Sequence, residues 1–515
     1  MQFLQNIKLI QGGMGVYVSN WRLARAVSQE QPGITAGTVS GTALDIVYVR
    51  LLQLGDPGGH VRRALAAFDA QFGVSIGQKI LDRYYIEGGK DPQARFKNAP
   101  KQTVHALDEH NLLPLPLQPG TVQPLTVDQD VIELLIATAF AEVWLARQGN
   151  PGRIFINFLH KIELALVYSM YGAMLACVDG IIVGAGNPDG LPAICTRLAE
   201  QAAVEIELPV LYRESGESFR VSFDPKTVAD GKLALTPLPR PAFLAIVSLQ
   251  DLVQALAQSQ SQAPDGFIIE HHTAGGHNAG PQGPLKKDEL GQPIYGPQDE
   301  PDLQAIRQVG KPFWLAGGYG SHAKLTQAMA LGANGVQVGS VFALAEESGM
   351  KATYRSAILN ALKTETTEEG LIHTTLFSPT GFPFKVVQLE GTLADDAIYT
   401  ARRRVCDLGL LQQRGLSKPD TAGKRRLFQR CPAAPLDDFV GKRGLPLNAS
   451  ERRCLCNGLL ACVGLGQTGI LDGTLSEEPA IVTLGNHLDG IRHLSRNGQF
   501  SYWVHDVVTD ILGQD

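Results

Sequence analysis

The sequence has no hydrophobic run long enough to cross a membrane and no export signal. A spanning helix needs about 20 consecutive apolar residues, and no segment of the 515 residues approaches that length. The N-terminal stretch MQFLQNIKLIQGGMG has a short apolar run and no cleavage-site pattern. We therefore expect a cytoplasmic protein that does not associate with membranes.

Cysteine is also scarce, and two binding patterns are missing. Seven cysteines in a chain of this length exclude a disulfide scaffold. No basic stretch is interleaved with aromatic residues, so nucleic acid is not an expected partner. Gly184-Ala185-Gly186 is followed by Asn-Pro-Asp-Gly instead of a third spaced glycine, which argues against a separate dinucleotide-binding domain.

The sequence does contain eight short apolar runs without polar alternation. Such runs are typical of parallel strands that are buried on both faces. Helical patterns lie between most of them, and eight strand-helix units predict an α/β protein with a closed TIM (β/α)8 barrel. The expected strands are Ile7–Gln11, Ile34–Thr38, Arg153–Asn157, Asp179–Val183, Ala242–Val247, Gly266–Glu270, Pro312–Ala316 and Gly335–Val338.

This strand pattern predicts a barrel over residues 1–350 with three insertions. The insertions span about residues 50–150, 205–241 and 278–299, and the last follows the sixth strand, where a lid over an active site is expected. Beyond residue 350 the strand-helix rhythm stops. We expect residues 351–515 to form a mainly helical appendage that is rich in cysteine and arginine.

The last two predicted strands end in small residues that suit a phosphate group. One strand runs into Gly317-Gly318, and the next runs into Gly339-Ser340. Glycines let backbone N–H groups approach a phosphate, and a following helix adds the positive end of its dipole. In a TIM barrel, the loops after strands seven and eight are the usual phosphate site.

Two further motifs follow predicted strands. Gly12-Gly13-Met14-Gly15 can lie flat against an aromatic ring system. The sixth strand leads into Glu270-His271-His272-Thr273-Ala274-Gly275-Gly276-His277. We expect His271 and His272 to point apart and to bind no metal, whereas the Gly-Gly turn delivers His277 beside a bound ring as an acid or base.

In their order along the chain, these motifs resemble those of the nitronate monooxygenase-like flavoproteins, formerly called 2-nitropropane dioxygenases. The matching segments are IQGGMG, GAGNP at Gly184–Pro188, E-x4-GGH-x2-G at Glu270–Gly280, and AGG with GANGVQVGS. The family includes flavin-dependent enoyl reductases and the enoyl reductase components of polyunsaturated fatty acid and polyketide synthases. The resemblance covers residues 5–50 and 152–350.

The resemblance implies FMN in a TIM barrel. Its flavin would contact Gly13, Met14, Asn157, Gly275 and Gly276, and its phosphate would lie between Gly317-Gly318 and the segment that holds Gln337, Gly339 and Ser340. His277 matches the histidine of the family motif. It would deprotonate or orient a nitronate, or assist reduction of an enoyl thioester. His271, His272 and Thr273 replace the small and acidic residues that usually precede the motif, which leaves the substrate class open.

Four of the seven cysteines cluster in the predicted appendage. Cys431, Cys454, Cys456 and Cys462 lie within 32 residues, with arginines among them. Neighbouring thiolates can hold an iron–sulfur cluster or zinc. The C-x-C-x5-C spacing matches no common ferredoxin or zinc-finger pattern, so free cysteines without metal are the other interpretation.

Charge is distributed unevenly. The chain carries a net charge of −6, whereas residues 401–460 hold 13 Lys/Arg against 5 Asp/Glu, a net of +8. This basic segment is either a solvated surface or a docking site for an acidic electron carrier or acyl carrier protein. The sequence leaves a homodimer open as well.

The main hypothesis is an FMN-dependent oxidoreductase of nitronate monooxygenase or enoyl reductase type with His277 as its acid or base. One alternative is an iron–sulfur flavoprotein reductase that takes electrons from a small carrier such as ferredoxin. A second alternative is a non-catalytic flavin-binding component of a synthase complex.

Overall fold

The computed structural model describes residues 1–515 except 109, 117, 119, 365–369, 403–405, 472–473, 492–493, 495–500 and 514–515. Within the described part of the chain, no helix is long and apolar enough to span a membrane.

Eight parallel strands close into a barrel in which each strand pairs with its neighbours in chain order, and the last pairs with the first. The predicted α/β TIM barrel is therefore confirmed, and all eight predicted strands are present with ends shifted by at most two residues. The barrel strands are β1 (Leu9–Gln11), β2 (Thr35–Ser40), β6 (Arg153–Leu159), β7 (Gly180–Gly184), β11 (Ala242–Val247), β12 (Gly266–Glu270), β13 (Phe313–Ala316) and β14 (Gly335–Val338).

The inside of the barrel is filled by apolar side chains from the strands. Trp314 lies at its centre, fully buried, and its indole N–H donates to the Ile7 carbonyl at 2.9 Å. The short 3-10 helix η1 (Gln2–Asn6) adds Leu4 to the same cluster. The barrel is thus a packed core, and any ligand must bind at one of its ends.

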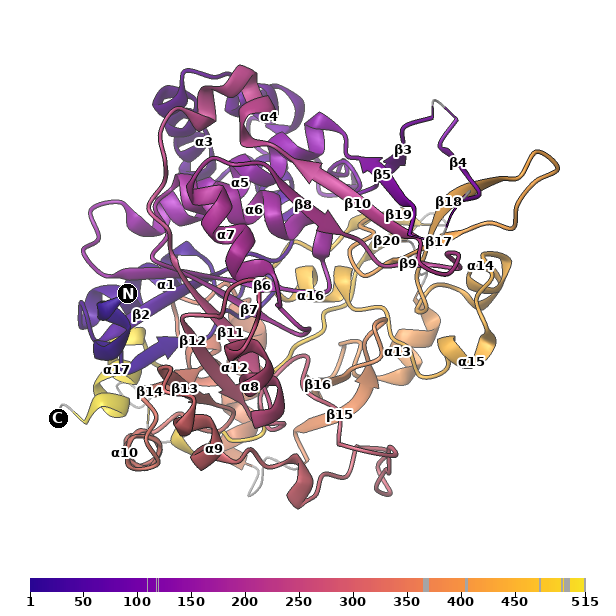
Figure 1. Cartoon of the computed structure of the whole chain (residues 1–515). Coiled ribbons are helices and arrows are strands. Elements are labelled where there is room, and N and C mark those ends of the chain that lie inside the picture. The colour runs from indigo at the N-terminus through magenta and orange to yellow at the C-terminus, as the bar shows by residue number, and fades with distance from the viewer. Residues whose placement is uncertain are drawn as a thin grey trace.

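Helices cover the outside of the barrel between the strands (Figure 1). Each buries one apolar face against the strands, the arrangement that parallel sheets require. These helices are α1 (Trp21–Glu30), α6 (Glu163–Leu175), α7 (Leu191–Ala199), α8 (Gln250–Ala257), α9 (Leu303–Gln308), α10 (His322–Ala330) and α11 (Ser340–Ala343).

The first insertion is mostly helical and packs against one side of the barrel. Its longest helix, α5 (Gln129–Arg147), is buried along almost its whole length and lies against α6. The excursion comprises α2 (Leu44–Gln53), α3 (His60–Phe72), α4 (Ile76–Tyr84), β3 (His105–Ala106), β4 (Leu112–Pro114), β5 (Val122–Thr126) and α5.

The second insertion joins the first one and the appendage through small sheets. Strand β10 (Ser218–Phe223) pairs with β5 and with β8 (Val204–Glu207), whereas β9 (Val210–Leu211) pairs with β17 (Gln413–Leu416). The 3-10 segment η2 (Pro225–Ala234) leads back to the barrel. The third insertion has little regular structure apart from η3 (Pro297–Asp299).

The appendage mixes short helices with three strand pairs, whereas the sequence predicted a mainly helical region. Its helices are α12 (Ala352–Thr364), α13 (Asp396–Ala401), α14 (Leu436–Gly441), α15 (Pro446–Ala449), α16 (Cys456–Cys462), η4 (Asp489–Ile491) and α17 (Val504–Leu512). The strand pairs are β15 (Ile372–Phe377) with β16 (Pro383–Val387), β17 with β18 (Lys424–Arg430), and β19 (Thr468–Leu471) with β20 (Thr474–Glu477).

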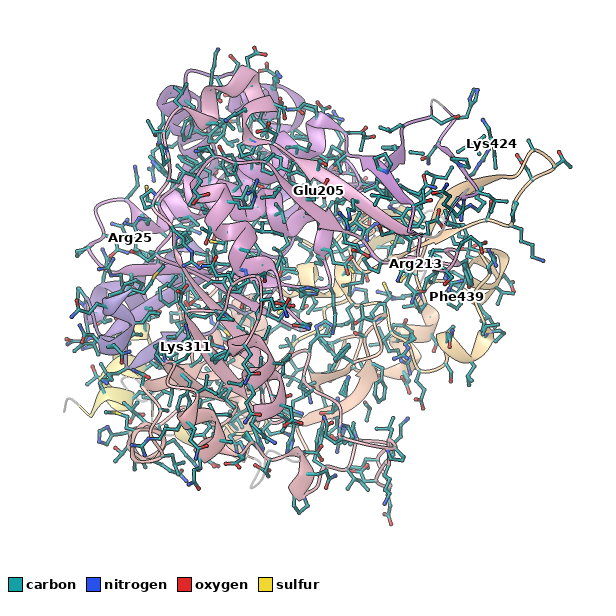
Figure 2. All side chains as sticks on the ribbon, in the orientation of Figure 1. Arg25, Glu205, Arg213, Lys311, Lys424 and Phe439 are labelled. Atoms are coloured by element: carbon teal, nitrogen blue, oxygen red, sulfur yellow. The ribbon has the colours of Figure 1, made fainter. Side chains whose placement is uncertain are left out.

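The chain returns to the barrel at its end, where α17 lies against α1 beside the N-terminus (Figure 1). Figure 2 shows Lys424 and Phe439 of the appendage on the same side of the molecule as Arg213 of the second insertion. The pairing of β9 with β17 joins these two regions.

Several charges of the basic segment 401–460 pair with other segments of the chain, and three of them, Arg414, Lys424 and Arg425, attach the appendage to the barrel and its insertions. Five of its basic side chains form ion pairs with carboxylates outside the segment: Arg402–Glu478, Arg414–Glu163, Lys424–Asp108, Arg425–Glu217 and Arg453–Asp396. Much of the positive charge therefore binds neighbouring segments of the same chain.

Candidate functional site

A cavity of about 250 Å³ opens at the carboxyl ends of the barrel strands, where TIM barrels bind their ligands. Its wall contains all eleven residues that the sequence and the family resemblance assigned to the flavin and its chemistry. They are Gly13, Met14, Asn157, Gly275, Gly276, His277, Gly317, Gly318, Gln337, Gly339 and Ser340.

The loop after β1 lies close against the third barrel strand. Asn157 donates from Nδ2 to the Gly13 carbonyl at 3.1 Å, and the Ser19 hydroxyl accepts the Met14 N–H at 2.8 Å. A Cβ atom on Gly13 would lie 2.1 Å from the Asn157 Cβ. Only glycine permits this approach, and Met14 is thereby held at the cavity wall.

The two glycine-lined strand tips lie side by side. Strand β13 pairs with β14 so that Ala316 is opposite Gln337, and the tips continue from there into Gly317 and Gly339. Gly317 and Gly318 adopt φ angles of +90° and +89°, a backbone conformation that suits glycine. The two strand tips that the sequence predicted for a phosphate are therefore neighbours at the cavity wall.

A segment of the appendage completes the cavity, which the sequence gave no reason to expect. Thr483, Leu484, Gly485 and His487 line the wall, and the Gly485 N–H donates to the Ser340 hydroxyl at 2.8 Å. A Cβ atom on Gly318 would lie 2.5 Å from the His487 ring. Residues 483–487 thus cover the strand tips directly.

His277 lies where the third insertion begins, against the appendage hairpin. Its ring meets Phe384 edge-on at 4.9 Å between centroids, and the neighbouring Gly276 carbonyl accepts the Lys385 N–H at 3.0 Å. The residue is partly exposed, but its Nε2 is buried and has no hydrogen-bond partner. Burial, reinforced by the charge of Lys161, lowers the pKa of His277 to about 3, so its imidazole is neutral.

Three charged side chains that the sequence did not single out for catalysis lie near His277. Burial raises the pKa of Glu270 to about 7, against the lowering effect of Lys385 and Lys161. Burial also lowers the pKa of Lys161 to about 7 and that of Lys385 to about 8, opposed in both by Glu270. Groups with pKa values near neutrality suit proton transfer, so this cluster can exchange protons at physiological pH.

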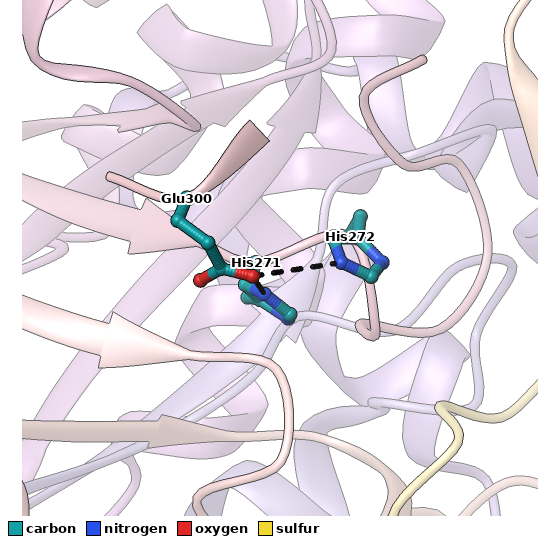
Figure 3. A group of neighbouring side chains, drawn as sticks. All are labelled: His271, His272 and Glu300. Carbon is teal, nitrogen blue, oxygen red and sulfur yellow. Dashed lines mark hydrogen bonds and ion pairs between the residues drawn. The ribbon is translucent and has the colours of Figure 1, made fainter. Parts of the chain in front are cut away.

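His271 and His272 do not point apart as the sequence predicted. Their rings lie 4.0 Å apart between centroids, and both approach Glu300 Oε1, His271 Nε2 at 3.0 Å and His272 Nε2 at 4.0 Å (Figure 3). The prediction assumed an extended strand, but β12 ends at Glu270 and a turn follows. Glu300 follows the third insertion, so these contacts join the two ends of that loop.

Among the described residues, His271, His272 and Glu300 are the one set of three potential metal-binding side chains whose ligand atoms all lie within 4.8 Å of one another. His271 has a partner at each ring nitrogen, Glu300 Oε1 at 3.0 Å from Nε2 and the Thr273 hydroxyl at 2.8 Å from Nδ1. His272 stacks on Tyr295 at 3.8 Å between ring centroids. In this structure, hydrogen bonds of His271 to Thr273 and Glu300 connect the two ends of the third insertion.

The four cysteines that the sequence offered as possible metal ligands do not all line one cavity. Cys431, Cys454 and Cys456 line a second cavity in the appendage, next to the barrel cavity. Cys462 lies outside that wall and is buried in the apolar cluster beside the barrel. Cys406, which the sequence did not single out, lines the second cavity instead.

The neutral state of His277 predicts an acid-sensitive stability. Between about pH 6.5 and pH 3 the unfolded chain protonates this histidine and the folded chain does not, so stability falls as pH decreases by up to about 1.4 kcal/mol per pH unit. We expect His277→Gln to flatten this part of the profile in urea unfolding measured across that range. A variant profile parallel to that of the wild type would contradict the neutral imidazole.

The residues of the barrel cavity fit FMN on the chemistry of their unpartnered polar atoms. His277 Nε2, Gln337 Oε1 and Thr483 Oγ1 are buried without a hydrogen-bond partner, and all three residues line the cavity. Orphaned polar atoms are costly unless a ligand or water satisfies them. A polar ring edge and a phosphate would provide such partners.

A comparison with known protein families matches the half of the barrel that holds β11 to β14. The family model for nitronate monooxygenase matches residues 240–374. No curated protein matches the chain.

The chain also has low similarity to three solved structures. FabK from Thermotoga maritima is 14% identical with a TM-score of 0.45, covering 99% of this chain and 94% of its own. The enoyl reductase domain of MlnA from Bacillus amyloliquefaciens is 12% identical with a TM-score of 0.40, covering 98% and 93%. Nitroalkane oxidase from Streptomyces ansochromogenes is 13% identical with a TM-score of 0.38, covering 74% and 77%.

The family match and the cavity coincide. Residues 240–374 supply β11, β12, β13 and β14 with the loops that carry His277, Gly317-Gly318 and Ser340. Over residues 240–374 the chain is therefore similar to nitronate monooxygenase, and these residues form half of a closed TIM barrel.

Proposed function

We propose that the barrel cavity binds FMN and reduces or oxidises a small unsaturated or nitro substrate, with His277 at the reacting atoms. The observation that carries this proposal is the convergence of the glycine tips, Gln337 and His277 on one cavity. Gly13, Met14 and Asn157 would face the flavin ring, and Gly317, Gly318 and Ser340 its phosphate. When bound, FMN supplies hydride or single-electron chemistry.

The role of His277 is set by its neutral imidazole. A neutral ring can accept a hydrogen bond or a proton at Nε2, and it can pass on a proton only if another group replaces it. Glu270 and Lys161, with pKa values of about 7, are the nearby groups that hold exchangeable protons. We infer that His277 orients the substrate and that protons reach the site from this pair.

The apolar part of the wall favours an unsaturated acyl substrate over a small nitro compound. A hydrocarbon chain gains binding energy from each apolar contact, at roughly 25 cal/mol per Å² buried. Barrel and appendage residues together provide such a surface beside the glycine tips. Its side chains are Phe158, Ile162, Phe384, Leu410, Leu411 and Leu459.

The first experiment identifies the cofactor and the substrate. We expect mass spectrometry of the purified protein to find FMN. Consumption of a 2-enoyl thioester with a reduced electron donor would support the acyl substrate, whereas consumption of a nitronate with O2 would support oxidation of a nitro compound. Bound FMN without turnover of either would favour a non-catalytic component of a synthase.

We expect His277→Gln to retain FMN and to lower kcat/KM by about 10²–10⁴-fold, the usual contribution of a positioned acid or base. His272→Gln is the matched control, because this ring lies in the same loop but stacks on Tyr295. It should change kcat/KM little. Full activity in His277→Gln with FMN bound would remove the catalytic assignment.

A further inference from the structure

Four cysteines line one cavity of about 490 Å³ in the appendage. They are Cys406, Cys431, Cys454 and Cys456, which come from three separate segments, after α13, after β18 and at the start of α16. All are free thiols, and Cys456 lies close enough to the other three for their charges to interact. Four convergent cysteine side chains are a complete ligand set for an iron–sulfur cluster.

Helix geometry explains why Cys462 is not part of this set. Cys456 and Cys462 are the first and last residues of α16, six positions apart. At 3.6 residues per turn, they lie about 120° apart around the helix axis. Cys456 faces the cavity, whereas Cys462 packs into the apolar cluster beside the barrel.

Each of the four sulfurs has an N–H group directed at it. The Leu411 N–H donates to Cys456, the Ala433 and Ala434 N–H groups donate to Cys431, and the Arg402 guanidinium donates to Cys454. Gln412 Nε2 lies 4.0 Å from the Cys406 sulfur. In iron–sulfur sites, N–H donors to the cysteine sulfurs tune the potential of the cluster.

A buried polar network holds two of the three cysteine segments in place. Asp407 follows Cys406 and Asn457 follows Cys456, and Asn457 Nδ2 donates to Asp407 Oδ1 at 2.6 Å. Gln467 Nε2 donates to Asp407 Oδ2 at 2.7 Å. Arg50 of α2 contacts both, with Nη1 at 3.1 Å from Asn457 Oδ1 and Nη2 at 3.4 Å from Asp407 Oδ2.

The spacing of the sulfurs argues against a single zinc ion. All seven cysteines lie in the described part of the chain, and no three of their sulfurs are within 4.8 Å of one another. Tetrahedral zinc with Zn–S bonds of about 2.3 Å would bring its thiolates within about 4 Å of one another. A cluster of iron and sulfide is larger than one ion and fits thiolates that are further apart.

The cysteine cavity and the flavin cavity share part of a wall. Leu410, Leu411 and Cys456 line both of them. A redox centre bound by Cys456 would therefore be separated from the barrel cavity by little more than these side chains. This position suits electron transfer between the two sites.

We propose that Cys406, Cys431, Cys454 and Cys456 bind an iron–sulfur cluster that delivers electrons to the flavin site. One iron of the cluster is reduced by a small one-electron carrier protein of ferredoxin type and is oxidised again when the electron leaves. Two such transfers, with two protons, balance the reduction of one C=C bond. The delivery step rests on the proposed FMN function, whereas the cluster site does not.

The test of the site is iron and sulfide content in anaerobically purified protein. We expect about two to four iron ions per chain with equal sulfide, and a paramagnetic signal after reduction with dithionite. Cys406→Ala should lose the iron, and because Cys406 is exposed, its removal leaves the fold intact. Cys431→Ala should also lose it, whereas the matched control Cys462→Ala should retain it.

Several outcomes would overturn the cluster. They are zinc in place of iron, no iron after anaerobic reconstitution with ferrous iron and sulfide, or loss of iron in Cys462→Ala but not in Cys406→Ala. FMN is quantified in the same samples, so failure of the flavin assignment is seen separately from failure of the cluster.

The delivery step has its own measurement. Reduced methyl viologen, a one-electron donor, is mixed with the holoprotein and flavin absorbance is followed. We expect rapid bleaching in the wild type and in Cys462→Ala, and loss of this phase in Cys406→Ala with FMN still bound. Equal rates in all three proteins would show that the cluster does not supply the flavin.

Discussion

Replacing Arg425 by methionine is expected to lower the free energy of unfolding by roughly 3–5 kcal/mol, the cost of removing one partner from a buried ion pair. Arg425 and Glu217 are almost fully buried, with side chains 1% and 0% exposed. The guanidinium donates twice to the carboxylate, at 2.8 and 2.6 Å. Without it, Glu217 remains as an uncompensated charge in the interior.

The pair joins three parts of the chain. Glu217 lies in the second insertion and Arg425 on β18 of the appendage, and Arg425 also donates to the Pro114 carbonyl in the first insertion at 2.7 Å. Gln123 of that insertion donates to Glu217 at 3.0 Å. We therefore expect the variant to weaken the attachment of the appendage as well as its local stability.

Urea unfolding measures this effect, and two further variants control it. Arg425→Met combined with Glu217→Met should recover most of the loss, because replacing both charges of a buried pair by apolar groups is often neutral. Arg220→Met on neighbouring β10 removes the exposed pair Arg220–Glu205 and should cost only about 0–1 kcal/mol. An equally small cost for Arg425→Met would contradict the structural role of the buried pair.

Ser340→Asp is expected to abolish FMN retention. Ser340 lies at the tip of β14 in the proposed phosphate site, where an added carboxylate would face the phosphate. Two like charges at 4 Å repel by about 4 kcal/mol at an effective dielectric constant of 20. This weakens binding by about three orders of magnitude.

The measurement is the flavin-to-protein ratio of the purified variant and the Kd of added FMN. Ser340→Asn is the matched control, since asparagine has nearly the same shape as aspartate and no charge. It should retain much more FMN than the aspartate variant. Stoichiometric FMN in Ser340→Asp would place the phosphate elsewhere.

The appendage is part of the candidate active site. Residues 483–487 cover the strand tips, β16 places Phe384 against His277, and Leu410 and Leu411 extend the cavity wall. Mutations in these segments should therefore change activity even though the family model ends at residue 374. The ion pairs of the basic segment help to hold these elements on the barrel.

Neighbouring residues were sufficient to predict the barrel and its glycine tips. Runs such as Ala242–Val247 and Gly266–Glu270 predict strands buried on both faces, and the structure has both with the same bounds. Each barrel strand pairs with the next one along the chain, so local order fixes which tips become neighbours. The pairing of β13 with β14 therefore brings Gly317 close to Gly339, as the sequence predicted.

Local rules were insufficient where the chain turns. An extended strand would separate His271 from His272, but the strand ends one residue earlier and both rings turn toward Glu300. Burial perturbs the pKa values of Glu270 and Lys161, and each opposes the shift of the other across 109 positions of the chain. Neither feature leaves a local pattern.

By itself the sequence determined the barrel, its glycine-lined strand tips and the position of His277, because each depends on residues within one strand and the loop that follows it. Only the tertiary structure decided which cysteines meet. Cys462 is near the others in sequence but faces away on α16, whereas Cys406 is 25 positions before Cys431 and lines the same cavity. The periodicity of α16 and the contacts between distant segments determine which cysteines line the cavity. The spacing of the cysteines along the chain reveals neither.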